Sequence, residues 1–445
     1  MPDYSESNLK RNGRLLAVYR VVSMLLSLAY VPVVLGYLGT GLYGIWSTVL
    51  NIVSWVNYFD IGIGNGLRNK LSAALARKES DSSIKSLISS AYFMLVLVVL
   101  GVMIISLVVF QFIDWDSLLG ISDDLYGGAG AVIELSYALM CIGFIFSICK
   151  SLFFAVQQAH MVNLMGVVQQ AAMLASVLLL TGYSGDKLMA VAVAYGVSAL
   201  IVELVFSVIF FMKNRGWTPS FSMVSKKDAL SVTGLGIQFF IVQIASLVLS
   251  TTDNIIVSNI FGPAAVTPYS TALKLFTVPV SLYVAVISPY WSSVTAQCAT
   301  GDVTGVRRGI RRMQTLLWIV IVPCAILTIV FEPLTTLWLG QRLDMPAGLV
   351  WLNLIYAIIY SWNAIYSQVS NGMSIMRMMI AVAVLQAIVN IPLSFILAST
   401  IGNSSGVLLG TVLTMLLSAV VYPIYIKKRL KSMAAAGRSD GGIGK

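Results

Sequence analysis

Charged side chains are scarce in this chain. Only 10% of its 445 residues are Asp, Glu, Lys or Arg, while 58% are hydrophobic and the mean hydropathy is +0.88. Soluble proteins carry about 25% charged residues. This balance excludes an ordinary soluble domain and predicts an integral, multi-pass membrane protein.

Cysteine and histidine are also rare, and alternating strand patterns are missing. The four cysteines lie in apolar segments or in segments expected on the cytoplasmic side, so no disulfide framework is predicted. The one histidine, His160, has no ligand-type partners around it, so we expect neither a metal site nor a cofactor. Without strand patterns, the apolar segments are read as helices.

Apolar segments long enough to cross a membrane recur twelve times. They run near 15–38, 42–61, 87–112, 129–153, 163–183, 188–212, 230–260, 267–296, 314–333, 348–370, 378–399 and 405–426. Most of the 28 Lys and Arg residues fall before the first segment, in every second connection or after the last. The positive-inside rule then predicts twelve helices with both termini in the cytoplasm. It also explains the net charge of +10 without a nucleic-acid partner.

The two halves of the chain resemble each other. FQFIDWDSLLG, which begins at Phe110, echoes FEPLTTLWLG, which begins at Phe331, and KNR at Lys213 mirrors KKR at Lys427. Since six helices are an even number, the two copies share their orientation, as in two-lobed carriers that work by alternating access. The predicted parts are a cytoplasmic N-terminus (1–14), two parallel six-helix lobes (15–212 and 230–426), a cytoplasmic connection (213–229) and a basic cytoplasmic tail (427–445).

Polar side chains recur at helical spacing along the tenth segment. They are Asn353, Tyr356, Tyr360, Asn363, Ser367 and Ser370. Amides, hydroxyls and flat aromatic rings suit a carbohydrate, so this stripe is interpreted as the lining of a hydrated path that binds substrate. Polar packing between helices is the alternative.

Five of the charged residues within or beside the apolar segments are candidates for function. Arg20, near the start of the first segment, either binds a diphosphate or extends to the interface. Asp253 and Lys274 are predicted to lie at equal depth and to form an ion pair, either static or broken by the substrate or a cation. Glu203, near the middle of the sixth segment, and Asp60, at a cytoplasmic mouth, are candidates for ion coupling or gating.

Three stretches of the chain resemble a known family. They are LGTGLYGIW from Leu38, FDIGIGNGLRNKLSAALA from Phe59 and DNIIVSNIFGPAAVTPYSTALKLF from Asp253. They look like the Wzx-type O-antigen flippases, polysaccharide transporters of the multidrug/oligosaccharidyl-lipid/polysaccharide exporter superfamily. The resemblance implies a V-shaped carrier that moves undecaprenyl-diphosphate-linked oligosaccharide from the cytoplasmic to the periplasmic leaflet. Relatives that flip lipid II place an arginine in the first helix, which supports Arg20 as a substrate contact.

We therefore expect a non-enzymatic flippase of the bacterial inner membrane, without catalytic residues and driven by a proton or sodium gradient. Its expected partners are the lipid-linked oligosaccharide, the bilayer and other O-antigen assembly proteins. One alternative is a multidrug extrusion carrier of the same superfamily, with a smaller, more apolar or aromatic–acidic pocket. Another is a membrane polysaccharide polymerase or ligase, but that activity needs a large periplasmic loop, and the periplasmic connections here are short.

Overall fold

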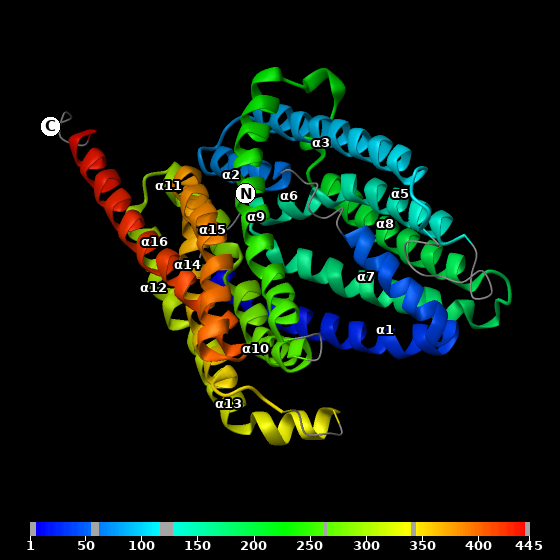
Figure 1. Cartoon of the computed structure of the whole chain (residues 1–445). Helices are drawn as coiled ribbons and strands as arrows, with labels where there is room; N and C mark the ends of the chain where they lie inside the picture. The colour runs from blue at the N-terminus through cyan, green and yellow to red at the C-terminus, as the bar shows by residue number, and fades with distance from the viewer. Residues whose placement is uncertain (1–5, 55–61, 116–127, 262–264, 340–343, 441–445) are drawn as a thin grey trace. The chain divides into compact units, whose positions relative to one another are not determined.

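The computed structural model describes residues 6–54, 62–115, 128–261, 265–339 and 344–440 (Figure 1). The regular structure within these ranges is helical. The chain divides into two compact units, Met1–Phe240 and Ile241–Lys445. The boundary falls inside a helix, later in the chain than the connection expected at 213–229.

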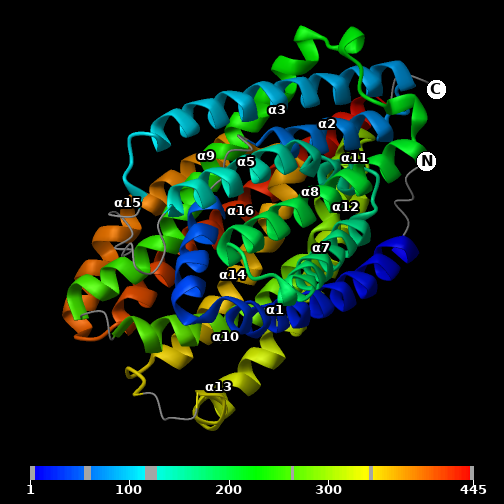
Figure 2. The ribbon, with the colours of Figure 1, turned by 90° about the vertical axis from the view of Figure 1, so that its right-hand side faces the viewer.

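The first unit is built from α1 (Glu6–Ser54), α2 (Ile63–Ala76), α3 (Asp81–Phe110), α5 (Ala129–Ser147), α6 (Cys149–Ala155), α7 (Ala159–Leu179), α8 (Lys187–Lys213) and the start of α9 (Lys226–Phe261). Within this unit α1 packs along α7, and α5 packs along α8 (Figure 2). These four helices surround the cavity described below.

The second unit begins in α9 and continues with α10 (Val266–Ile287), α11 (Pro289–Ala299), α12 (Val303–Thr315), α13 (Trp318–Leu339), α14 (Leu349–Gly372), α15 (Met376–Ile401) and α16 (Ser405–Asp440). Figure 1 shows α14, α15 and α16 side by side, and α16 contacts both of the others. Residues with positive φ mark two of the helix boundaries here: Gly348 (φ 80°) precedes α14, and Gly402 (φ 76°) ends α15.

Ten helical stretches of the described residues are long and apolar enough to cross a membrane, which confirms a multi-pass membrane protein. Two of the predicted segments are not among them. The segment near 42–61 continues the first one within α1, where Gly39 (φ 75°) departs from helical geometry, and its end lies outside the described residues. The segment near 230–260 falls on α9. The count of twelve spans and the sidedness of the termini stay predictions.

The glycine cluster that follows α1 is a packing feature of the first unit. A methyl group added to Gly66 of α2 would lie 2.5 Å from the carbonyl oxygen of Val232 in α9, and one added to Gly62 would collide with the backbone at Gly236. The absence of a side chain at Gly66 thus lets α2 approach the backbone of α9.

Gly66→Ala should destabilise the protein by about 1–3 kcal/mol, because the added methyl group meets backbone that has no room to move. The matched control is Gly101→Ala in α3, where nothing lies within 4 Å of the added atom and the gain in helix propensity is small and favourable. Thermal unfolding of both variants in detergent measures the difference. Equal melting temperatures would show that the contact between α2 and α9 contributes nothing.

Candidate functional site: a cavity in the first unit and a buried carboxylate in the second

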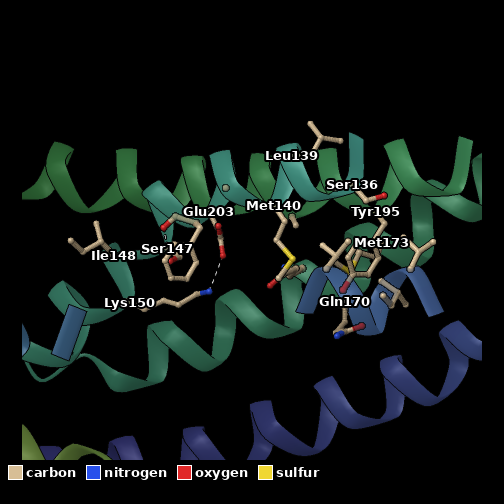
Figure 3. Close-up of a pocket in the computed structure, with 18 of the residues that line it drawn as sticks. Ser136, Leu139, Met140, Ser147, Ile148, Lys150, Gln170, Met173, Tyr195 and Glu203 are labelled. Atoms are coloured by element: carbon tan, nitrogen blue, oxygen red, sulfur yellow. Dashed lines mark hydrogen bonds and ion pairs between the residues drawn. The ribbon is translucent and has the colours of Figure 1, made fainter. Parts of the chain in front are cut away.

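The first unit encloses a cavity of about 450 Å³. This volume lies within the range of small-molecule sites, roughly 300–1,000 Å³. Its apolar wall includes side chains of α1, α3 and α5. The polar residues that line it are Ser136, Ser147, Lys150, Ser151, Gln169, Gln170, Tyr195 and Glu203 (Figure 3). The cavity therefore offers hydrogen-bonding groups of both kinds, donors and acceptors, beside an apolar wall.

An ion pair crosses one end of the cavity. The Lys150 ammonium donates to Glu203 Oε1 over 2.8 Å (Figure 3). The Glu203 side chain is 10% exposed and that of Lys150 is 37% exposed, so the carboxylate is the more deeply buried partner. The lysine supplies the opposite charge that the Glu203 carboxylate would otherwise lack inside the unit.

Local sequence explains how the two charges meet. Tyr195 and Glu203 are eight residues apart on α8, which places both on the face that lines the cavity. On the facing side, α5 ends at Ser147 and α6 begins at Cys149, so Lys150 belongs to a separate short helix that also borders the cavity. Gly143 leaves room for the pair, since a methyl group there would lie 3.2 Å from Glu203 Oε2.

Aromatic rings close the other end of the cavity. Tyr195 packs edge-on against Trp46 of α1, with ring centroids 5.4 Å apart, and against Tyr30 at 6.4 Å. Ser136 Oγ, on the same wall, is buried and has no hydrogen-bond partner among the described residues. A hydroxyl in that position is available to a water molecule or a ligand.

The second unit contains a buried carboxylate of its own. Asp253 of α9 is 6% exposed. It accepts a hydrogen bond from Tyr269 Oη (2.9 Å) and others from Thr411 Oγ1 (2.9 and 3.0 Å). These hydrogen bonds join three helices, since Asp253 belongs to α9, Tyr269 to α10 and Thr411 to α16.

A polar network continues from this carboxylate into α15. Asn390 Nδ2 donates to Thr411 Oγ1 (2.9 Å), and Gln386 Nε2 donates to Ser418 Oγ (3.0 Å). Asn390 Oδ1 is buried and has no partner in the part of the chain that the structure describes. Carboxylate, hydroxyl and amide oxygens therefore gather at one place in the second unit.

The predicted ion pair between Asp253 and Lys274 is wrong. Lys274 is exposed on α10, and no ion pair joins it to Asp253 among the described residues. Tyr269, five residues earlier, takes the position facing Asp253, and five residues turn an α-helix by about 140° from the original face. A prediction of equal depth does not fix which side of α10 faces α9.

The structure separates the predicted polar stripe of α14 into two groups. Asn353 and Ser370 are fully buried, and Asn363, which is 8% exposed, donates to the Met415 carbonyl of α16 (3.0 Å). Asn353 donates within α14 to the Leu349 carbonyl, and Ser370 Oγ has no hydrogen-bond partner among the described residues. Only Asn363 of the three therefore bonds to a neighbouring helix in the described part of the chain. Tyr356 and Tyr360 pack on each other with ring centroids 5.8 Å apart, and Tyr360 is 41% exposed.

Two of the predicted functional residues, Arg20 and Asp60, belong to the first part of the chain. Arg20 is exposed on α1, outside the residues that line the cavity. Asp60 lies outside the described residues. Neither the diphosphate role of Arg20 nor the gating role of Asp60 is tested by this geometry.

The described helices that are long enough to cross a membrane lie in two units, each with buried polar groups, and this fold is shared with solved transporters. An outward-facing multidrug resistance MATE family transporter of the MOP superfamily has the same fold: its TM-score is 0.80 at 12% identity, with 96% of both chains covered. A MOP superfamily transporter from Pyrococcus furiosus Vc1 (DSM3638) gives a TM-score of 0.72 at 14% identity and the same coverage.

Residues 9–294 match the family described as "Polysaccharide biosynthesis protein", and the chain belongs to that family. A Salmonella typhimurium protein named "Putative O-antigen transporter" is 22% identical over 404 residues, covering 88% of this chain and 90% of its own. The Bacillus subtilis membrane protein EpsK is 21% identical over 421 residues, covering 92% and 81%. The resemblance to polysaccharide transporters is confirmed.

Proposed function

We propose that this protein is a flippase that moves undecaprenyl-diphosphate-linked oligosaccharide, an O-antigen repeat unit, from the cytoplasmic to the periplasmic leaflet of the inner membrane. The observation that carries the proposal is the polar cavity of the first unit, with its Lys150–Glu203 pair. A sugar headgroup needs donors and acceptors within the membrane, and this cavity supplies them. Such a carrier performs no covalent step.

The ion pair favours an oligosaccharide over a cationic drug. A pocket that selects organic cations needs a carboxylate whose charge is available to the ligand. Here the Glu203 charge is compensated by Lys150 at 2.8 Å, so a cation would have to displace the lysine first. Neutral sugars are instead met by hydroxyls and amides, and an acidic sugar by Lys150 itself.

We place ion coupling at Asp253. A carboxylate buried among hydroxyl and amide oxygens takes up either a proton or a small hard cation such as sodium, and each changes the charge of the second unit by one. Uptake would also compete with the hydrogen bonds from Tyr269 and Thr411. The carrier would then alternate its access as this group loads and unloads.

Further substrate contacts are proposed at accessible residues. Tyr356 and Tyr360 would stack on sugar rings. Arg20 in the first unit and Lys274 in the second are exposed, and each is proposed by itself as a contact for phosphate oxygens. Asn363 would act indirectly, by holding α14 against α16, and Asn353, which donates to Leu349 within α14, by supporting the helix itself.

Tyr360→Ala should lower surface polysaccharide by about 3- to 10-fold, the loss expected from one aromatic stacking contact. The amount of protein in the membrane should not change, because the side chain is already 41% exposed. Ile355→Ala is the control, since Ile355 is 44% exposed on the same helix. Equal losses from both substitutions would assign Tyr360 to packing or lipid contact instead.

Complementation tests the function itself. The chain should restore surface polysaccharide in a bacterium whose own O-antigen flippase gene has been deleted, when a matching repeat unit is supplied. Failure to restore polysaccharide for any of several repeat units, together with new resistance to cationic drugs, would favour a multidrug carrier.

A further inference from the structure

The second unit has a groove that the proposed transport cycle does not use. It has a volume of about 460 Å³ and lies between α12 and the end of α16, with Tyr366 of α14 beside it. Four basic residues border it: Arg307, Arg311, Lys427 and Lys431. The two arginines are four residues apart on α12, and the two lysines are four residues apart on α16. Each helix therefore presents one pair of cations to the groove.

These four cations have no acidic counterpart in the described ranges of the chain. Among the described residues, no carboxylate forms an ion pair with any of them. Four like charges that converge on one groove repel each other, at a cost that an anion in the groove removes. By contrast, the pKa of the Asp302 carboxylate that caps α12 is lowered by hydrogen bonds from Gly305 and Thr304 and, after these, by the neighbouring Arg308, which is close enough to contribute. The basic residues of this region are thus not equivalent, and those that line the groove form no ion pair within the part of the chain that the structure describes.

The floor of the groove is apolar. Ile426 and Leu430 are 1% and 4% exposed, and Tyr366 is 7% exposed, with its hydroxyl accepting from Gln314 Nε2 (3.0 Å). A small inorganic anion would use the cations but not this floor. A ligand with a phosphate headgroup and an attached apolar chain would use both.

We propose that this groove binds an anionic phospholipid, with the headgroup phosphates between the arginines of α12 and the lysines of α16. The positive-inside rule assigns this end of the unit to the cytoplasmic leaflet, where anionic lipids meet basic segments. Arginine suits phosphate oxygens through its planar set of donors, and lysine adds a compact charge. Two pairs of cations fit a headgroup with two phosphates, such as that of cardiolipin. The assignment does not depend on which substrate is transported.

The test uses the purified full chain in detergent, titrated with cardiolipin, phosphatidylglycerol or phosphatidylcholine and followed by native mass spectrometry and thermal unfolding. The groove variant is Arg307→Gln with Lys427→Gln. The control is Arg308→Gln with Lys428→Gln, which removes the same charge from the neighbouring positions of the same two helices. All four side chains are exposed, so both variants should fold.

We expect cardiolipin to bind more tightly than phosphatidylcholine and to raise the melting temperature of the unmodified chain and the control. The groove variant should bind cardiolipin about 10- to 30-fold more weakly. Equal weakening in both variants, or equal binding of all three lipids, would overturn the proposal.

A second arm separates the phospholipid from the transported lipid, which also carries two phosphates. Undecaprenyl diphosphate is added in the presence of saturating cardiolipin. Binding that cardiolipin does not reduce, and that the groove variant does not change, supports a phospholipid site. Tight binding of undecaprenyl diphosphate that only the groove variant loses, and that cardiolipin fails to displace, would assign the groove to the transported lipid and overturn the proposal.

Discussion

Lys150→Gln should abolish transport and lower the amount of protein in the membrane, because it leaves the Glu203 carboxylate without its cation. Breaking a buried pair costs about 3–5 kcal/mol, but Lys150 is 37% exposed, so solvent screening reduces the expected loss to about 1–2 kcal/mol. Lys226→Gln, at an exposed position of α9, is the control and should change neither quantity. Membrane abundance and surface polysaccharide are measured for both variants.

The double variant Lys150→Gln with Glu203→Gln separates stability from transport. It removes both charges and keeps side chains of similar size, so abundance should return close to that of the unmodified protein. Transport should stay below one tenth of the rate of the unmodified protein, because the polar cavity has lost the ion pair that we assign to the transport site. Full transport by this double variant would reduce the pair to a structural element and remove it from the transport site.

Asp253→Asn should leave the protein in the membrane at normal levels but uncouple it from its driving ion. Asparagine keeps the shape of the side chain and one oxygen that can accept from Tyr269 or Thr411. It cannot take up a proton and carries no charge to hold a cation. Transport driven by an imposed ion gradient in inverted membrane vesicles should therefore fall by at least tenfold.

The ion is identified by imposing sodium and proton gradients separately. Thr411→Val should weaken a sodium response more than a proton response, since the hydroxyl oxygen is a ligand for sodium but not a requirement for protonation. Asp228→Asn is the control, because Asp228 is also a carboxylate that accepts from a hydroxyl, at 2.6 Å from Ser86 Oγ. Gradient-driven transport that survives in Asp253→Asn would exclude Asp253 as the coupling group.

The two buried carboxylates were predictable from the sequence, but their partners were not. Glu203 and Asp253 stand out because an acidic residue inside an apolar segment is costly unless it has a function or a partner. Lys150 lies at the end of its apolar segment, where a lysine usually extends to the interface. In the structure, α5 ends before Lys150, and Lys150 belongs to α6, where it borders the same cavity as Glu203.

The partners of Asp253 show a second limit of sequence reasoning. Thr411 is 158 residues away on α16, and a single threonine in an apolar helix carries no signal of its own. Lys274 carried the stronger signal, since opposite charges at equal depth favour a pair. The rotation of α10 about its axis decides between Tyr269 and Lys274, and that rotation is set by packing within the second unit.

Helical spacing likewise predicted the face of α14 but not what covers it. Asn353, Tyr360 and Asn363 follow one pattern, yet two of them are buried and one is exposed. A stripe of polar residues does not distinguish a neighbouring helix from a water-filled path, because both accept hydrogen bonds. Here the hydrogen bond from Asn363 to α16 shows that a neighbouring helix covers this residue.

Reconstitution of the purified chain in liposomes tests the proposed flipping most directly. A fluorescent undecaprenyl-diphosphate-linked oligosaccharide is placed in both leaflets, and the fraction open to an impermeant quencher is followed after an ion gradient is imposed. We predict directional movement that stops in Asp253→Asn and in the Lys150→Gln, Glu203→Gln double variant. Movement no faster than in protein-free liposomes, for several repeat units and under both proton and sodium gradients, would contradict the assignment of this protein as a flippase.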